Sequence, residues 1–210
     1  MGEQHARSAL VVKLGGSLAE TSTLKSWLKA LAAYSRPLVI VPGGGAFADI
    51  VRAMQPDMGY DNATAHAMAL LAMQQYALAL AFLWPQLVCV EKSSKVIKAL
   101  KRREIPCWFP SVSALDKTLP KTWEVTSDTL AAWLAGGIKA ERLLLIKSLD
   151  LPAPGPTMAE LARAGIVDPL FPKYARASGT KVFVAGPTAL ADARALLAQG
   201  LVPGSEIRLG

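Results

Sequence analysis

The sequence predicts one α/β domain with three layers, in which a mostly parallel sheet lies between two layers of helices. Short apolar runs alternate with longer segments of helical periodicity along the whole chain, and this alternation is typical of parallel sheets. The length of 210 residues and the apolar content of 52% are sufficient for one large core. The same values exclude a disordered chain and a small disulfide-stabilised scaffold.

The first half of the chain contains four expected strands separated by helices. The strands are short apolar runs bounded by glycine, proline or charged residues, and they cover residues 9–14, 36–41, 86–90 and 105–109. The helices have apolar residues at spacings of three and four, and they cover residues 18–34, 46–55, 62–84 and 94–103. The order strand, helix, strand at the start of the chain indicates a parallel pair.

The second half continues the same alternation. We expect a helix that Thr126 or Ser127 caps and that Gly136 and Gly137 end. Pro187 is expected to begin the last helix. Further strands are expected at residues 142–146, 181–186 and 205–209, the last at a sheet edge, and further helices at residues 157–165 and 187–200. The proline-rich segment 150–156 is too short to divide the chain, so we expect residues 1–210 to form one domain.

One apolar stretch is as long as a membrane span. Residues 62–90 carry no charged side chain, and a span needs about 20 apolar residues. Gln74 and Gln75 in its middle and Pro85 near its end favour instead a buried helix of a protein with no membrane partner. The N-terminus has no long apolar run, and the two cysteines lack metal-site spacing, which favours a reducing compartment. We therefore expect a cytoplasmic protein.

The chain is basic, with 23 Lys and Arg residues against 16 Asp and Glu and a formal net charge of +7. This excess favours an anionic partner such as a nucleotide, a phosphorylated metabolite, a nucleic acid or an acidic lipid, and the charge alone does not choose among them. Part of the excess lies on one basic helix, at Lys92, Lys95, Lys98, Lys101, Arg102 and Arg103. We interpret this helix as a solvated face and expect no nucleic-acid partner.

Two glycine-rich loops follow the first two expected strands. The first comprises residues 13–17, Lys-Leu-Gly-Gly-Ser, and the second comprises residues 42–45, Pro-Gly-Gly-Gly. Backbone N–H groups in such loops can bind an anion at the start of a helix, although a tight turn also uses glycine for conformational reasons alone. Together they suggest two loops that face one phosphoryl group. The Walker and dinucleotide-binding fingerprints are absent from the sequence.

Three segments in this order resemble the amino acid kinase superfamily. They are VVKLGGS at residues 11–17, VIVPGGG at residues 39–45 and TSDTLAAWLA at residues 126–135. The resemblance spans most of the chain and implies a three-layer α/β/α fold and an ATP-dependent kinase. The short chain, together with PGGGAFADIVR, WEVTSDTLAAWLA, LLLIKSLD and VDPLFPKYA, looks most like the small branch of [5-(aminomethyl)furan-3-yl]methyl phosphate kinases. That branch implies a phosphate monoester acceptor, a diphosphate product and a role in methanofuran-type cofactor synthesis in C1 metabolism.

The resemblance assigns the catalytic roles residue by residue. Lys13 matches the lysine that bridges the outer phosphates of the nucleotide, and Asp128 matches the aspartate that orients the lysines. The second catalytic lysine is matched best by Lys173, with Lys147 as the competitor and as a nucleotide-binding residue. Such a site suits phosphoryl transfer, in which positioning and electrostatics matter more than covalent chemistry. Mg²⁺ would be held mainly by nucleotide phosphates and water, so we expect no protein metal cage.

The remaining expected site residues bind phosphate groups or the acceptor. Gly15, Gly16 and Ser17 are assigned to the nucleotide phosphates, and the three loop glycines Gly43, Gly44 and Gly45 to the acceptor. An ammonium group on the acceptor would need an acidic or aromatic partner, for which the candidates are Asp49, Asp57 and Asp61. Each of them could also be a helix cap or a surface carboxylate. His66 is assigned to the acceptor site or to a hydrogen-bonded place in the core.

Two positions depart from better-known members of the superfamily. Glu124 and Thr126 stand where acetylglutamate kinase-like sequences carry asparagines, which makes a carboxylate acceptor less suitable. Residues 46 and 47, Ala-Phe, follow the second glycine loop, without the histidine of isopentenyl phosphate kinase-like sequences. Carboxylate, carbamate and other phosphate acceptors remain alternatives on charge alone.

A non-catalytic nucleotide-binding module is the alternative to an enzyme. Its basic helix would then contact nucleic acid or a protein partner. The joint presence of Lys13, both glycine loops and Asp128 favours a small-molecule kinase. We also expect a homo-oligomer, because the apolar helix at residues 62–84 can serve an isologous interface as well as a core.

Overall fold

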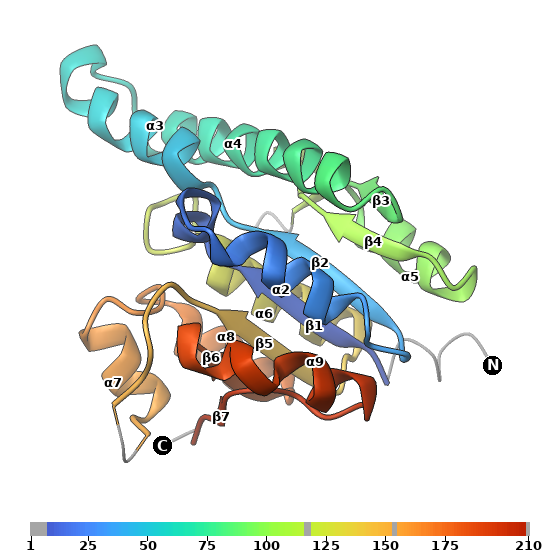
Figure 1. Cartoon of the computed structure of the whole chain (residues 1–210). Coiled ribbons are helices and arrows are strands. Elements are labelled where there is room, and N and C mark those ends of the chain that lie inside the picture. The colour runs from blue at the N-terminus through green and yellow to red at the C-terminus, as the bar shows by residue number, and fades with distance from the viewer. Residues whose placement is uncertain (1–7, 116–118, 153–154, 209–210) are drawn as a thin grey trace.

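A seven-stranded sheet forms the middle layer of the molecule, and helices cover both of its faces (Figure 1). The computed structural model describes residues 8–115, 119–152 and 155–208. The strand order is β3-β4-β2-β1-β5-β6-β7, and all neighbours are parallel except β6 and β7. The strands are β1 (Leu10–Leu14), β2 (Leu38–Pro42), β3 (Leu87–Val90), β4 (Ile105–Trp108), β5 (Arg142–Ile146), β6 (Lys181–Ala185) and β7 (Ser205–Glu206). The predicted fold class is confirmed.

The helices form the two outer layers. Helices α2 (Thr23–Leu31) and α9 (Leu190–Ala198) pack against each other on one face, and α6 (Ser127–Ile138) and α8 (Phe171–Ser178) pack on the other (Figure 1). The other α-helices are α3 (Gly45–Met58), α4 (Asn62–Leu83), α5 (Ser93–Lys101) and α7 (Met158–Arg163). In the part of the chain that the structure describes, the short 3₁₀ helices are η1 (Gly16–Glu20), η2 (Val112–Ala114) and η3 (Pro187–Ala189).

Helix α6 does not end where the sequence analysis expected. It continues through Gly136 and Gly137 to Ile138, and Lys139 ends it with a φ of +55°. Gly136 serves packing instead, because a Cβ there would lie 3.0 Å from the Cα of Ser178 on α8. The expected stop at the two glycines is therefore wrong. Gly136 is required instead by the close approach of α8, a helix that the local sequence pattern does not predict.

Helix α4 is the long apolar helix. By length and composition it could cross a membrane, and 39% of its apolar 18-residue stretch is buried. One side packs on the core through Leu70, Met73, Tyr76, Ala77 and Leu80. Its other side exposes Leu71, Leu78 and Phe82. The helix thus combines a buried face with an apolar exposed one.

The carboxyl ends of β1, β2 and β5 meet in the centre of the sheet. Lys13 on β1 pairs in register with Val41 on β2 and Leu145 on β5. Because parallel strands end at the same edge, the loops that follow all three strands open into one crevice. Helices α3 and α6 begin at this edge as well, which directs their N-terminal turns toward the crevice.

Candidate active site

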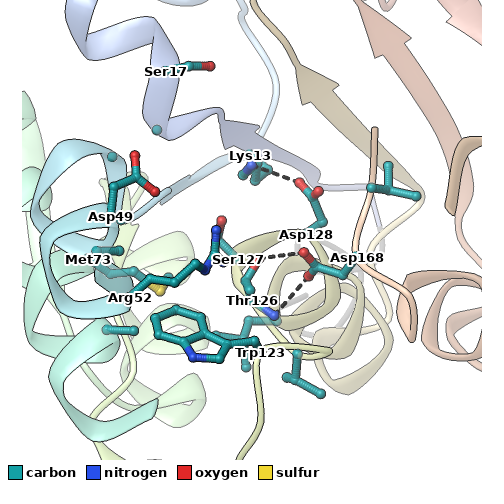
Figure 2. Close-up of a pocket in the computed structure, with 18 of the residues that line it drawn as sticks. Lys13, Ser17, Asp49, Arg52, Met73, Trp123, Thr126, Ser127, Asp128 and Asp168 are labelled. Atoms are coloured by element: carbon teal, nitrogen blue, oxygen red, sulfur yellow. Dashed lines mark hydrogen bonds and ion pairs between the residues drawn. The ribbon is translucent and has the colours of Figure 1, made fainter. Parts of the chain in front are cut away.

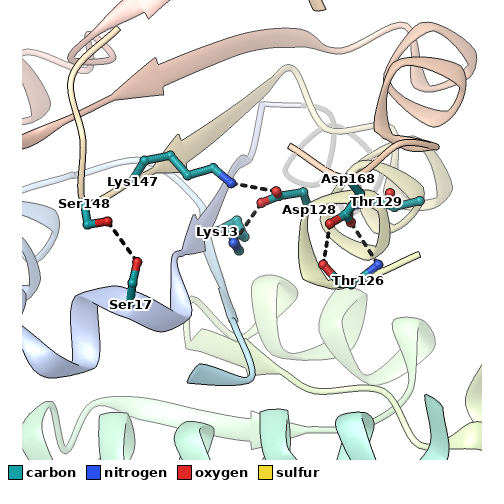
Figure 3. Close-up of polar contacts among 8 residues, drawn as sticks. All are labelled: Lys13, Ser17, Thr126, Asp128, Thr129, Lys147, Ser148 and Asp168. Atoms are coloured by element: carbon teal, nitrogen blue, oxygen red, sulfur yellow. Dashed lines mark hydrogen bonds and ion pairs between the residues drawn. The ribbon is translucent and has the colours of Figure 1, made fainter. Parts of the chain in front are cut away.

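Three charged side chains meet at this crevice. Asp128, on the first turn of α6, lies with one carboxylate oxygen 2.8 Å from the Nζ of Lys13 and accepts a hydrogen bond from the Nζ of Lys147 at 2.6 Å (Figure 3). Lys13 comes from the end of β1, and Lys147 directly follows the neighbouring strand β5. The register of β1 and β5 brings the two lysines to the same carboxylate. All three side chains are largely buried.

The electrostatics of this group make it a site for an anion. Burial by itself raises the pKa of Asp128, but the ammonium groups of Lys13 and Lys147 outweigh it and hold this pKa at about 2. Burial also lowers the pKa of Lys147, and the carboxylate of Asp128 opposes that change. Two ammonium groups share one carboxylate, so the trio carries an excess positive charge in a poorly solvated place.

The two glycine loops pack directly against each other beside the trio. A Cβ on Gly16 would overlap the backbone nitrogen of Gly45, and a Cβ on Gly43 would lie 2.5 Å from the nitrogen of Gly16. Gly45 also has a φ of +55°, which favours glycine. The glycines are therefore needed for the close approach of the loops, whatever they bind.

The loop glycines differ in which N–H groups can meet a ligand. The N–H of Gly15 donates to the carbonyl of Ile146 at 3.0 Å, and that of Gly43 donates to the carbonyl of Leu14 at 2.9 Å. These two groups, expected as phosphate donors, are thus engaged at the ends of the strands. Gly44 and Gly45 stand at the start of α3, where helix geometry leaves backbone N–H groups without partners. The helix dipole there favours negative charge.

The crevice contains a cavity of about 430 Å³. Its lining includes most of the expected site residues, namely Lys13, Gly16, Ser17, Gly44, Gly45, Asp49, His66, Asp128 and Lys147. Asp57 and Asp61 are not in this lining, and Asp61 instead caps α4 by accepting from the N–H of Thr64 at 2.8 Å. Gly15 and Gly43 lie just behind the lining, in the loops described above. A cavity of this size suits a small metabolite.

Helix α3 supplies a charged wall of the cavity opposite the trio. Asp49 and Arg52 are one turn apart on α3, and Figure 2 shows them across the cavity from Lys13 and Asp128. The guanidinium of Arg52 lies over the ring of Trp123, 4.4 Å from its centroid. Arg52 and Trp123 were not among the expected site residues. The spacing of Asp49 and Arg52 on one helix face was the signal that could have identified Arg52.

His66 is buried on α4 at the edge of the same cavity. Burial lowers its pKa, and the nearby charge of Lys121 lowers it further. The ring is therefore neutral at physiological pH and suits a hydrogen bond better than an ion pair. The structure places His66 in the lining of the cavity.

Lys173 lies elsewhere. It is exposed on α8, with its Nζ 5.8 Å from the centroid of the neighbouring Tyr174 ring, and it is not in the lining of the cavity. Lys147 occupies the place beside Asp128 that the second lysine was expected to take. The structure therefore groups Lys13, Asp128 and Lys147 and leaves Lys173 outside.

The residues present are compatible with magnesium held by a nucleotide. Among the described residues, no group of three or more His, Cys, Asp or Glu side chains could hold a metal ion. Both carboxylate oxygens of Asp128 already face an ammonium group. A metal ion here would take its ligands from nucleotide phosphates and water, which is a common arrangement for Mg²⁺.

Comparisons with known proteins agree with this geometry. Residues 8–150 match the model of the amino acid kinase family. The chain is also 26% identical over 145 residues to [5-(aminomethyl)furan-3-yl]methyl phosphate kinase from Methanocaldococcus jannaschii. That alignment covers 67% of this chain and 66% of the relative, slightly less than two thirds of the relative's length.

Solved structures of kinases share the fold. Uridylate kinase from Archaeoglobus fulgidus superposes with a TM-score of 0.69 at 16% identity, over 96% of this chain and 100% of that one. UMP kinase from Ureaplasma parvum gives 0.65 at 15% identity, over 89% and 93%, and aspartate kinase from Synechocystis gives 0.66 at 16% identity, over 85% and 38%. The family match covers more than half of the chain, and the sheet order, the glycine loops and the buried trio accompany it: this protein belongs to the amino acid kinase family.

Proposed function

We propose that this protein is an ATP-dependent kinase that transfers the γ-phosphoryl group to a small phosphate monoester and forms a diphosphate. The observation that carries the proposal is the pair of ammonium groups, on Lys13 and Lys147, held by buried Asp128 where two glycine loops meet. Phosphoryl transfer needs positive charge fixed in place around the moving group more than it needs covalent chemistry.

Each member of the trio has a distinct role in this proposal. The ammonium groups of Lys13 and Lys147 stabilise the negative charge that spreads over the transferred group and the leaving nucleotide. Asp128 orients them and does not act as a base, because a pKa of about 2 makes its carboxylate a very weak proton acceptor. Mg²⁺, bound with ATP, neutralises further phosphate charge. Gly16, Gly44 and Gly45 allow the backbone to approach the phosphates.

We propose an aminomethylfuran phosphate as the acceptor. The distant relative is named for that substrate, and the wall formed by α3 offers both charges that such a molecule requires. The guanidinium of Arg52 matches a phosphate, and the carboxylate of Asp49, one turn away, matches an ammonium group. The ring of Trp123 lies beneath the guanidinium of Arg52 and helps to hold that cation in place. The product would enter methanofuran-type cofactor synthesis in the cytoplasm.

The test is release of ADP from Mg-ATP with a panel of acceptors: the aminomethylfuran phosphate, isopentenyl phosphate, UMP, acetylglutamate and carbamate. The proposal expects turnover on the furan phosphate and its loss in Asp128→Asn, with ATP affinity retained. Asp192→Asn is the matched control, because Asp192 is exposed on α9, on the other side of the sheet. Turnover on a different acceptor alone would identify that acceptor as the substrate instead of the furan phosphate. ATP binding without any turnover would favour a non-catalytic module.

We also propose a homodimer formed through the apolar exposed faces of α3 and α4. Phe82 is 83% exposed, and it continues a stripe with Leu71 and Leu78 along α4. The exposed apolar side chains of α3 are Phe47, Ile50, Met54 and Met58. Contiguous apolar surface of this kind is typical of an interface.

Light scattering of the purified protein tests the dimer. Phe82→Glu should halve the measured mass, because a carboxylate would be buried without a partner at the interface. Leu201→Glu is the control, since Leu201 is an exposed apolar residue that lies before β7 instead. A mass equal to one chain in the wild type would refute the dimer.

A further inference from the structure

A second aspartate, Asp168, faces the start of the catalytic helix from the loop between α7 and α8. It is largely buried and lines the cavity together with Val167 and Pro169. One oxygen of its carboxylate accepts from the N–H groups of Thr126 and Thr129, each at 2.9 Å, and the other accepts from the hydroxyl of Thr126 (Figure 3). Three donors from one helical turn thus converge on this carboxylate.

These contacts replace an ordinary helix cap. The first N–H groups of a helix have no partner within it, and usually the residue just before the helix supplies one from its own side chain. Thr126 stands at that position of α6 but makes no such bond, because its hydroxyl donates to Asp168 instead. The cap of α6 therefore comes from a residue 42 positions away in the sequence.

Asp128 lies within the capped turn. It is the second residue of α6, between Thr126 and Thr129, whose N–H groups both donate to Asp168. A shift of this turn would move the carboxylate of Asp128 relative to Lys13 and Lys147. We propose that Asp168 is a positioning residue for phosphoryl transfer, which caps α6 from another wall of the cavity and so fixes Asp128 between its two lysines. This inference rests on the proposed kinase function of the same site.

The charge of Asp168 reaches the trio as well. Lys147 is faced by Asp128 from α6, by Lys13 from β1 and by Asp168 from the loop before α8. Burial and the charge of Lys13 lower the pKa of Lys147, while the two carboxylates oppose that change. Loss of the Asp168 charge should therefore lower the pKa of Lys147 further. Loss of a cap that lies away from the trio, such as Asp61 on α4, should leave this titration unchanged.

Three variants separate the effect of the Asp168 charge, the effect of its bond to the Thr126 hydroxyl, and a general loss of stability. Asp168→Asn keeps the size of the side chain but removes the charge and replaces one acceptor oxygen by a donor. Thr126→Val removes only the hydroxyl bond to Asp168 and leaves both backbone bonds in place. Asp61→Ala removes a helix cap of ordinary kind, on α4 and outside the cavity lining, and is the control for lost stability alone.

The first readout needs no substrate. The protein is labelled with carbon-13 at lysine Cε, the signal of Lys147 is assigned with Lys147→Met, and its pH titration is followed by NMR. We expect the midpoint to move to lower pH in Asp168→Asn and to stay unchanged in Asp61→Ala. An unchanged midpoint in folded Asp168→Asn would overturn the proposal, even if the wild type turned over no acceptor at all.

The second readout is steady-state kinetics with the acceptor that the wild type uses. We expect Asp168→Asn to lower kcat at least tenfold, with KM for ATP within threefold of the wild type, and Thr126→Val to have a smaller effect. Asp61→Ala should lower the thermal midpoint but keep kcat. A wild-type kcat in Asp168→Asn, or an equal loss in Asp61→Ala, would refute the positioning role, whereas an inactive wild type would count against the proposed function.

Discussion

The identity of the second lysine gives the sharpest prediction, and it compares Lys147→Met with Lys173→Met. Methionine keeps most of each apolar stem and removes only the ammonium group. The Nζ of Lys147 is 2.6 Å from Asp128 and its side chain is 12% exposed, whereas Lys173 is exposed on α8. The two substitutions therefore differ in location much more than in chemistry.

The expected magnitude follows from the site. Removal of one pre-positioned donor from a transition-state site costs about 10²- to 10³-fold in kcat, or about 3 to 4 kcal/mol. Lys147→Met should fall in that range and not abolish turnover, because Lys13 remains 2.8 Å from Asp128 and one cation still faces the phosphates. Lys173→Met should change kcat less than twofold.

The assay is ADP release at saturating Mg-ATP, with circular dichroism to show that both variants are folded. Loss of activity in Lys173→Met together with wild-type kcat in Lys147→Met would refute the reasoning. Such a result would mean that α8 moves to bring Lys173 into the cavity during turnover. Equal losses of kcat in both variants would show that both lysines act in turnover, and would contradict our assignment of Lys147 alone as well.

Three further predictions use the same geometry. Gly16→Ala should lower kcat/KM more than tenfold, as measured by ADP release, because its Cβ would overlap Gly45 and force the two loops apart. Gly137→Ala should raise the free energy of unfolding by about 1 kcal/mol in a urea titration, since nothing lies near the added Cβ on the exposed side of α6. Gly136→Ala should lower the free energy of unfolding, because its Cβ would meet Ser178. The pKa of Asp128 is about 2 in the folded state and ordinary in the unfolded state. Its ionisation should therefore contribute about 2 kcal/mol of stability above pH 4, and this contribution is lost between about pH 4 and 2. Acid unfolding of Asp128→Asn should lack this component.

Most strands were predictable from sequence because each is a short, largely apolar run between turn residues. Residues 142–146 illustrate this, since Arg142–Ile146 is observed as β5 with the same bounds. Helix α8 was missed because it has only eight residues and carries Pro172 in its first turn. The same helix explains the error at Gly136, where a glycine that allows close packing resembles one that ends a helix. The error at Gly136 thus depends on a contact between segments about 40 residues apart, which local patterns do not contain.

Lys13 and Asp128 could be assigned from sequence because each lies in a motif that resembles the amino acid kinase family. The choice between Lys147 and Lys173 could not be made from sequence, because each is a lysine after an apolar run. Only the pairing of β1 with β5 brings Lys147 to Asp128. Asp168 carries no local signal of its own. Its bonds to Thr126 and Thr129 cross 42 and 39 residues, so its role becomes visible only in the folded chain.

The charges of the buried cluster explain how a site for polyanions can be stable without a ligand. Lys13 and Lys147 bring two positive charges, and Asp128 and Asp168 bring two negative ones, so the four buried groups are balanced as a set. Burial and the charge of Asp128 raise the pKa of Asp168, and the hydrogen bonds from Thr126 and Thr129 and the charge of Lys13 oppose part of that change. Because the lysines are already held by carboxylates, their ammonium groups are fixed in place and largely desolvated before a ligand binds. Phosphate groups can therefore bind them without the cost of ordering and desolvating them. In the proposed kinase, Asp128 and Asp168 would therefore aid phosphoryl transfer by holding two cations together before the substrates bind.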